Sequence, residues 1–174
     1  DAEGIPLSVV LLTAFFALLH RYTGQEDLAV GVSVPGRDRR GAEKLVGPCS
    51  NRLPLRMDLS GDPSFRQLLS GVRDAFRAAR EHGSVPFEKL IEDLHPDRDM
   101  SRPSLVQAMF EFEDGRARSF EAAGAKFTRL EIEPHICSSD LALRFQQHGD
   151  GVAGGFDYST DLFRRETVER MEGH

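Results

Sequence analysis

The residues best suited to chemistry lie between positions 82 and 102, where His82 and His95 stand among several carboxylates. Histidines and carboxylates together can bind a metal ion or transfer protons. Their spacing does not favour a metal, because no pair forms the HExxH or HxH pattern typical of zinc sites. His82 follows a helical pattern and His95 precedes Pro96, positions typical of helix ends. We therefore interpret this stretch as the polar ends of two helices and predict no metal site.

A second group of residues matches the nucleotide-binding pattern GxGxxG at positions 149–154. That pattern must follow a strand and open a helix, so that helix amides meet a pyrophosphate. Here the following residues, which include "FDYST", have strand propensity, so we interpret the glycines as part of a hairpin. Ser138, Ser139 and Asp140 follow His135, but they enter a predicted strand. The sequence contains no GxSxG elbow, no P-loop and no other complete catalytic set.

The composition is that of an ordinary globular domain, with 40% hydrophobic and 29% charged residues over 174 positions. This length fits one domain with a sizeable core. The net charge of −6 disfavours a nucleic-acid backbone as a partner. Cys49 and Cys137 are far apart and lack CxxC spacing. We therefore expect two buried, reduced thiols, as in a cytoplasmic protein.

The most apolar run covers residues 5–19. It is shorter than the roughly 20 residues needed to cross a bilayer, and acidic residues precede it where a signal peptide would be basic. We expect a buried helix, no membrane span and a cytoplasmic location. The chain starts with Asp1 and ends within a helical pattern, which favours a piece trimmed from a longer protein.

Hydrophobic periodicity predicts helices and strands in an irregular order. Helices are expected at 7–22, 65–81, 86–94 and from 161 to the end, and strands at 28–34, 52–59, 105–113, 126–133, 141–147 and 152–158. We expect Asp62 and Pro63 to cap and begin the second helix, and Pro54 favours an edge strand. This order predicts an α/β fold, a two-layer sandwich of helices packed on a mixed β-sheet.

Several segments, taken in order along the chain, resemble the C-terminal half of a condensation domain from nonribosomal peptide synthetases. "VGPCSNRLPLR" (46–56) resembles the family's "IGxFxNTxxxR", "VPFEKL" (85–90) resembles "HQDxPFE", and "RDMSRPSLVQAMF" (98–110) resembles "RDxSRNPLFQVMF". The matched positions are Gly47, Asn51, Arg56, Pro86, Phe87, Glu88, Arg98, Asp99, Ser101, Arg102 and Gln107. Departures, such as Arg52 in place of Thr, leave amide-forming, ester-forming, starter, epimerising and degenerate subtypes open.

The resemblance implies that residues 1–174 are a chloramphenicol acetyltransferase-like half domain, the C-terminal lobe of a V-shaped whole. The family's catalytic HHxxxDG motif belongs to the N-terminal lobe, and this chain has no adjacent histidines. The resemblance therefore implies that the chain requires that lobe as a partner and is inactive alone. Donor and acceptor peptidyl carrier proteins would bring the substrates on phosphopantetheine arms, and no cofactor would bind this chain directly.

The function implied by the resemblance is a share in joining carrier-bound aminoacyl or peptidyl thioesters through an amide or ester bond. This lobe would form one wall of the substrate tunnel. The alternative is a degenerate, non-catalytic module that recruits a tailoring enzyme to the assembly line. In either case, a lobe face left uncovered by its partner would promote self-association.

The same resemblance places Asn51 and its neighbour Ser50 on the tunnel wall. The Asn51 amide could point toward the substrate, or Asn51 could be an ordinary turn residue at the start of a strand. Three arginines are expected to be structural, with Asp99 or Glu111 as partners: Arg56, Arg98 and Arg102. No residue of this chain is predicted to be catalytic.

Overall fold

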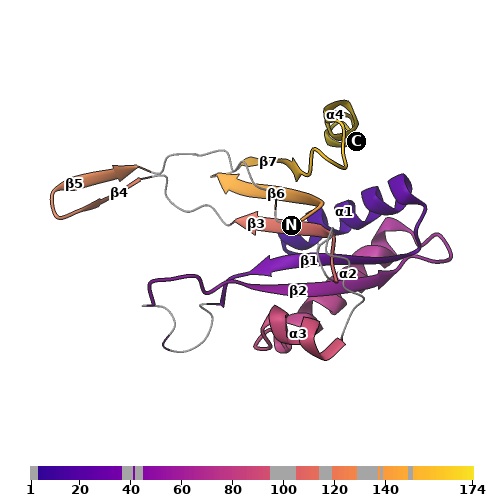
Figure 1. Ribbon diagram of the computed structural model, residues 1–174, viewed down its shortest axis with the longest axis horizontal. Helices are drawn as coiled ribbons and strands as arrows, with labels where there is room; N and C mark the ends of the chain where they lie inside the picture. Colours follow the sequence, from indigo (N-terminus) through magenta and orange to yellow (C-terminus); the bar gives the residue numbers. More distant parts are fainter. Residues whose placement is uncertain are drawn as a thin grey trace.

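A five-stranded sheet forms the centre of the fold, with the strand order β2-β1-β3-β6-β7 (Figure 1). The computed structural model describes residues 4–36, 41, 45–94, 105–113, 119–128, 137, 139–148 and 151–174. The sheet strands are β1 (Asp27–Val34), β2 (Asn51–Asp58), β3 (Ala108–Glu113), β6 (Leu141–His148) and β7 (Gly151–Tyr158). Strands β4 (Ser119–Ala122) and β5 (Ala125–Thr128) form a separate hairpin that extends away from the sheet (Figure 1).

The sheet is mixed, as the sequence predicts. The central strands β1, β3 and β6 run parallel, whereas the edge strands β2 and β7 pair antiparallel with β1 and β6. Pro54 lies in the edge strand β2, as expected, because its missing N–H need not break a hydrogen-bond ladder there. His148 pairs with Gly151 in a β6–β7 hairpin. The glycine-rich stretch therefore belongs to a hairpin and not to a nucleotide-binding turn.

Helices α1 (Leu7–Thr23) and α2 (Phe65–Glu81) pack on one face of the sheet. Side chains alternate between the two faces of a strand, and every second residue of the central strands faces these helices. The core members from the strands are Leu28, Val30, Val32, Leu53, Leu55, Phe110, Leu141 and Leu143. Helix α4 (Arg165–Glu172) adds Met171 to the same core. The apolar run predicted to be a buried helix is α1, whose Phe16 is fully buried.

Helix α3 (Phe87–Leu94) contributes to a second, smaller core on the opposite face. Its Phe87 packs with Val106, Met109 and Ala142. Met109 on β3 and Ala142 on β6 lie next to residues of the main core along each strand, so their side chains point to the opposite face. Gly31 of β1 lies beneath this cluster. A Cβ atom at Gly31 would collide with the Met109 side chain and lie 3.0 Å from Val106 Cγ2. The absence of a side chain at position 31 therefore allows this second core to close.

The start of α2 differs from the prediction that Asp62 and Pro63 cap and begin the helix. Ser64 is the N-cap: its hydroxyl accepts a hydrogen bond from the Gln67 amide, and the Gln67 side chain accepts one from the Ser64 amide. This reciprocal pair is a capping box, which satisfies two amides at the helix start. Asp62 instead has a positive φ of 50° in the preceding turn. Helix α2 therefore begins directly after Ser64, because Gln67 can form the reciprocal hydrogen bonds with Ser64.

The C-terminal elements also differ in detail from the prediction. Helix α4 begins at Arg165 and not near position 161, because the amides of Leu162 and Phe163 bond to the Ser159 carbonyl in a turn. The strand predicted at 126–133 is described as far as Thr128. Within the described ranges, no helix has the length and apolarity needed to cross a membrane.

Candidate functional site

A cavity of about 440 Å³ opens at the edge of the sheet where the parallel strands β1 and β3 end. It is lined by residues 33–35, 47–50 and 111–113. Two positions singled out from the sequence, Gly47 and Ser50, therefore lie on the same cavity. The carboxyl ends of parallel strands are where open α/β sheets commonly bind ligands. We take this cavity as the candidate functional site.

The segment 47–50 is held close to the end of β1. Val34 pairs with Asn51 in the antiparallel β1–β2 register, which brings the entrance of β2 beside the exit of β1. A Cβ atom on Gly36 would collide with the carbonyl group of Cys49. Gly47 has a φ of 147°, a conformation that side chains other than glycine rarely adopt. Gly36 thus allows the close approach, and Gly47 the backbone conformation, that shape this side of the cavity.

Asn51 joins the start of β2 to the connection between α2 and α3. Its Nδ2 donates hydrogen bonds to the Gly83 carbonyl at 3.1 Å and to the Val85 carbonyl at 2.7 Å. Its Oδ1 accepts a hydrogen bond from the Phe87 amide at 3.1 Å. Both amide hydrogens are therefore engaged within the chain. A direct role of Asn51 toward a substrate stays a prediction, whereas its role in positioning the α2–α3 connection follows from these three contacts.

The predicted motif residues at 86–88 form the start of α3. The Pro86 carbonyl accepts hydrogen bonds from the amides of Lys89 and Leu90, at 3.0 and 3.3 Å. Phe87 is 6% exposed and anchors the helix in the second core. Glu88 lies in the first turn, where a carboxylate interacts favourably with the helix dipole. Together with Asn51, these residues fix the entrance of α3 relative to β2.

Arg56 forms an ion pair within the chain, but its partner differs from the ones predicted. Its guanidinium donates two hydrogen bonds to the Asp27 carboxylate, at 2.8 and 2.6 Å. This contact lowers the pKa of Asp27 and raises the pKa of Arg56. Arg56 lies opposite Ala29 in the β1–β2 register, so a long side chain reaches Asp27 two residues away along β1. The expected partners Asp99 and Glu111 are therefore not needed at this position.

Glu111, the other expected partner of an arginine, pairs instead with its neighbour on β6. Arg144 Nε lies 3.1 Å from Glu111 Oε2 and 2.7 Å from Asp157 Oδ2 on β7. The Arg144–Asp157 contact is an ion pair without the alignment of a hydrogen bond. Glu111 pairs with Arg144 in the β3–β6 register, which explains the choice. The predicted motif residues Arg98, Asp99, Ser101 and Arg102 lie outside the described residues.

Gln107 lies at the other end of β3, away from the candidate site. Its carbonyl accepts hydrogen bonds from the amides of Asp140 and Leu141, at 3.0 and 3.3 Å, and so joins the starts of β3 and β6. Gln107 lines a separate cavity of about 450 Å³ that also includes Asp27 and Arg56. The motif positions thus divide between two ends of the sheet.

The polar groups at the candidate site can orient a bound molecule. They are the hydroxyls of Ser33 and Ser50, the thiol of Cys49 and the carboxylates of Glu111 and Glu113. Both carboxylates have partners on β6, because Glu111 pairs with Arg144 and Glu113 accepts a hydrogen bond from Gln146 at 3.2 Å. In the part of the chain that the structure describes, no group of three His, Cys, Asp or Glu residues could hold a metal ion.

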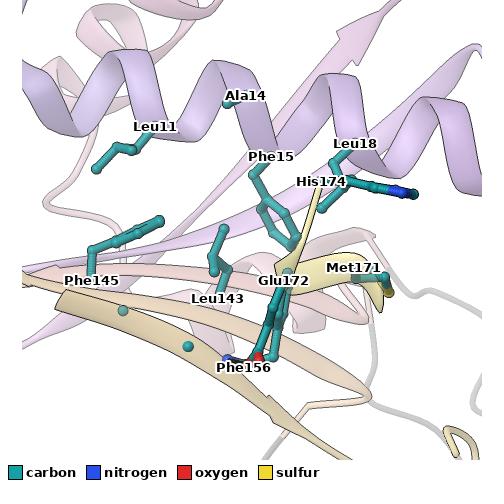
Figure 2. Close-up of a pocket in the computed structure, with 12 residues that line it drawn as sticks. Leu11, Ala14, Phe15, Leu18, Leu143, Phe145, Phe156, Met171, Glu172 and His174 are labelled. Atoms are coloured by element: carbon teal, nitrogen blue, oxygen red, sulfur yellow. Dashed lines mark hydrogen bonds between the residues drawn. The ribbon is translucent and has the colours of Figure 1, made fainter. Parts of the chain in front are cut away.

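A second cavity, of about 290 Å³, lies between α1, the β6–β7 hairpin and α4 (Figure 2). Its lining is mainly apolar, with Phe15, Phe145 and Phe156 among its side chains. The rings of Phe15 and Phe156 lie 6.1 Å apart. At its rim, Glu172 Oε1 accepts a hydrogen bond from the Phe156 amide at 3.4 Å. The arrangement suits apolar packing, and its two polar lining side chains, Glu172 and His174, contact the Phe156 amide and the Tyr22 hydroxyl.

Sequence reasoning missed two features of the candidate site. The partners of Asn51 lie more than 30 positions further along the chain, so no local pattern could reveal them. The close contact between Gly36 and Cys49 depends on the β1–β2 register in the same way. The glycine at position 36, just after a predicted strand, is the one local signal of a tight approach.

Known proteins are similar to this chain over almost its whole length. One family model, described as the condensation domain, matches residues 1–174. A linear gramicidin synthase protein from Brevibacillus parabrevis is 41% identical over 174 residues, which cover 99% of this chain and 3% of that protein. This chain is therefore similar to a small part of a very long relative.

Solved structures with the same fold extend the comparison. The X-domain from teicoplanin biosynthesis has a TM-score of 0.86 and 29% sequence identity, over 98% of this chain and 40% of that one. The complex of the X-domain and OxyB from teicoplanin biosynthesis has a TM-score of 0.83 and 29% identity, over 98% of this chain and 38% of that one. The chain thus spans less than half of each matched structure.

Proposed function

The chain belongs to the condensation-domain family of nonribosomal peptide synthetases, and from this premise we propose that it is the C-terminal lobe of such a domain. In this proposal the chain forms one wall of the tunnel in which two carrier-bound substrates are joined. The N-terminal lobe, with its HHxxxDG motif, forms the opposite wall and supplies the acid–base group. Donor and acceptor carrier proteins deliver the substrates on phosphopantetheine arms.

The observation that carries the proposal is the cavity lined by residues 47–50. These residues belong to a segment that resembles a family motif, and they lie at the carboxyl ends of β1 and β3. The three hydrogen bonds of Asn51 tie the same segment to the entrance of α3. A wall built in this way is rigid enough to position a substrate, and positioning is the main requirement of the reaction.

The reaction is the attack of an acceptor amine on a donor thioester. The amine nitrogen forms a bond to the thioester carbonyl carbon, the carbon–sulfur bond breaks, and the thiol of the donor arm leaves with a proton. A neutral amine needs alignment, exclusion of water and help with proton transfer more than it needs a strong nucleophile. We assign alignment to this chain, through Ser50 and the cavity around it, and proton transfer to the N-terminal lobe.

A substitution that fills the cavity tests this assignment. Ser50→Phe should block the cavity and lower the rate of amide formation at least about tenfold when the chain is co-expressed with an HHxxxDG-containing lobe. Leu45→Phe is the matched control, because Leu45 is 58% exposed and lies outside the cavity lining. Equal rates for the two variants would show that the cavity does not contain the reaction path.

The second candidate function is a non-catalytic module that recruits another enzyme. One observation favours it: the X-domain from teicoplanin biosynthesis, solved in complex with OxyB, has a TM-score of 0.83 to this chain at 29% identity. The two functions differ in the sequence that precedes this chain in its parent gene. An intact HHxxxDG motif there supports amide formation, and a damaged motif supports recruitment.

A further inference from the structure

The candidate cavity offers apolar surface beside polar groups. Successive side chains of a strand point to opposite faces of the sheet, so the ends of β1 and β3 each contribute both kinds of residue. Val34 and Phe112 line the cavity and are also partly buried against the main core. Ser33 and Glu111, which directly precede them along the two strands, line the cavity from the opposite face. A bound molecule therefore meets two different chemical environments in one cavity.

Two prolines and a cysteine add to the apolar part of the cavity. Pro35 and Pro48 line it, and proline has no backbone N–H to donate, so these positions present mainly ring surface to a bound molecule. Cys49 is a half-buried lining residue, and a free cysteine behaves as a small, polarisable apolar group. We call Val34, Pro35, Pro48, Cys49 and Phe112 the apolar lining.

Cys49 is the smallest member of the apolar lining. The family motif "IGxFxNTxxxR", which the segment 46–56 resembles, has phenylalanine at the position of Cys49. A phenylalanine would add an aromatic ring to the cavity wall, where the cysteine adds only a thiol. The cavity beside Cys49 measures about 440 Å³, within the range of about 300–1,000 Å³ typical of small-molecule sites. The space that the ring of the motif would take therefore stays available to a bound group.

The two kinds of lining match an aromatic ring that is joined to an amide. The Phe112 ring can pack against a second ring in a stacked or edge-to-face arrangement. The hydroxyls of Ser33 and Ser50 can donate a hydrogen bond to an amide of the same molecule or accept one from it. An aminoacyl group with an aromatic side chain carries both parts. A small side chain would leave the apolar lining in contact with water, at a cost of about 25 cal/mol per Å².

We propose that Cys49 is a specificity-determining residue and that the cavity beside it receives the aromatic side chain of a carrier-bound aminoacyl group. This inference rests on the proposed function, because it names the class of substrate that the reaction would use. The small side chain at position 49 leaves room for the ring, and a larger one excludes it. A single methylene group in an apolar pocket already changes selectivity about 10–200-fold, so competition between two whole rings for one space should have a large effect.

The test combines two substitutions at position 49 with a matched control. Cys49→Phe restores the ring of the motif, and Cys49→Ala keeps the space open. Leu162→Phe adds the same ring at a position that is 51% exposed and outside the cavity lining. Each chain is co-expressed with the HHxxxDG-containing lobe and given a phenylalanyl or an alanyl group on the donor and on the acceptor carrier protein. The rate of amide formation is measured for each combination.

The unsubstituted chain should have a higher kcat/KM for the phenylalanyl than for the alanyl group in one of the two positions, donor or acceptor. Cys49→Phe should lower kcat/KM for the phenylalanyl group in that position at least about tenfold and leave the alanyl group within about twofold. Cys49→Ala and Leu162→Phe should keep the preference of the unsubstituted chain. An equal loss for both groups in Cys49→Phe, or no preference in the unsubstituted chain, would overturn the proposal.

A separate readout, which needs neither turnover nor a variant, is the reactivity of the Cys49 thiol. If the unsubstituted assembly joins none of the substrates, the proposed function is wrong, and this readout decides the specificity of the cavity alone. Iodoacetamide labelling of the chain is followed by mass spectrometry in the presence of N-acetyl-phenylalaninamide or N-acetyl-alaninamide. Cys137, the other cysteine, lies outside the cavity lining and serves as the internal reference.

The labelling result follows from the place of Cys49 in the cavity wall. At saturation, the phenylalanine probe should slow the labelling of Cys49 at least about threefold relative to the alanine probe, because a bound ring shields the thiol from the reagent. The labelling of Cys137 should be the same with both probes. Equal labelling of Cys49 with the two probes, or equal slowing of both cysteines by the phenylalanine probe, contradicts the proposal.

Discussion

Replacement of Asn51 by alanine removes a side chain whose three hydrogen bonds are all defined in the structure. The substitution removes the side chain that donates to the Gly83 and Val85 carbonyls and accepts from the Phe87 amide. These three backbone groups would lose their partner together. Because they lie in the α2–α3 connection, the loss should loosen the entrance of α3 and the segment next to Ser50.

The expected loss of stability in Asn51→Ala follows from the number of these hydrogen bonds and their exposure to solvent. A hydrogen bond in a folded protein contributes about 0.5–1.5 kcal/mol net, so three would contribute about 1.5–4.5 kcal/mol. Two of the three bonds are partly buried and one is exposed, so water can replace part of the lost interaction. We expect Asn51→Ala to lower the free energy of unfolding by about 2 kcal/mol. For a domain of this size the melting temperature should fall by about 4–8 °C.

Denaturant unfolding and calorimetry measure this loss of stability. Two further variants serve as a control and as a test of the orientation of the Asn51 amide. Ser50→Ala, at the neighbouring exposed position, should change stability by less than about 0.5 kcal/mol. Asn51→Asp keeps an oxygen for the Phe87 amide but places a second oxygen beside the Gly83 and Val85 carbonyls. At neutral pH it should destabilise at least as much as alanine does. Stability should partly recover as the pH falls, because a protonated carboxyl can donate one hydrogen bond.

Two results would refute this reasoning. One is an Asn51→Ala variant whose unfolding free energy matches that of Ser50→Ala. The other is an Asn51→Asp variant as stable as the unsubstituted chain at neutral pH, since that would mean that the side-chain nitrogen does not face the two carbonyls. Faster hydrogen exchange of the Phe87 amide in Asn51→Ala would localise the effect to the entrance of α3.

Three further predictions concern the core, an ion pair and a close backbone contact. Phe16 is fully buried, so Phe16→Ala should lower the free energy of unfolding by about 3–5 kcal/mol in a denaturant titration, and a loss below about 1 kcal/mol would contradict the described core. The Arg56 contact lowers the pKa of Asp27, so its stabilisation is present above the unfolded-state pKa of Asp27 and is lost as the pH falls through the lower folded-state value. Arg56→Gln should therefore raise the pKa of Asp27 in an NMR titration, and an unchanged pKa would rule out the contact. Gly36→Ala should displace the Cys49 carbonyl and destabilise the chain by about 1–3 kcal/mol, measured by thermal melting; an unchanged melting temperature would contradict the close approach.

Features with a local cause could be predicted from the sequence. The apolar run at 5–19 becomes α1, and the alternating and apolar segments become strands of a mixed sheet. Pro54 marks an edge strand, because proline lacks the donor that an inner strand needs. Strand propensity after the glycines at 149–154 predicts a hairpin, and the antiparallel β6–β7 pairing confirms that prediction.

Features that depend on distant partners could not be predicted in the same way. Arg56 pairs with Asp27 because of the β1–β2 register, and a sequence pattern does not reveal a register before the fold is known. The three contacts of Asn51 likewise require the α2–α3 connection to be in place. The cap of α2 is a local feature that the prediction placed wrongly: Ser64 and not Asp62 is the cap, because Gln67 completes a capping box with Ser64.

The central claim is that this chain supplies one wall of a reaction tunnel and requires an HHxxxDG-containing lobe for amide formation. The measurement that tests it most directly is the rate of amide formation between two carrier-bound substrates, with that lobe alone, with this chain alone and with both co-expressed. We predict product from the co-expressed pair and none above background from either part. Product formed by the other lobe alone at the rate of the pair, or no product from a folded and associated pair, would contradict the claim.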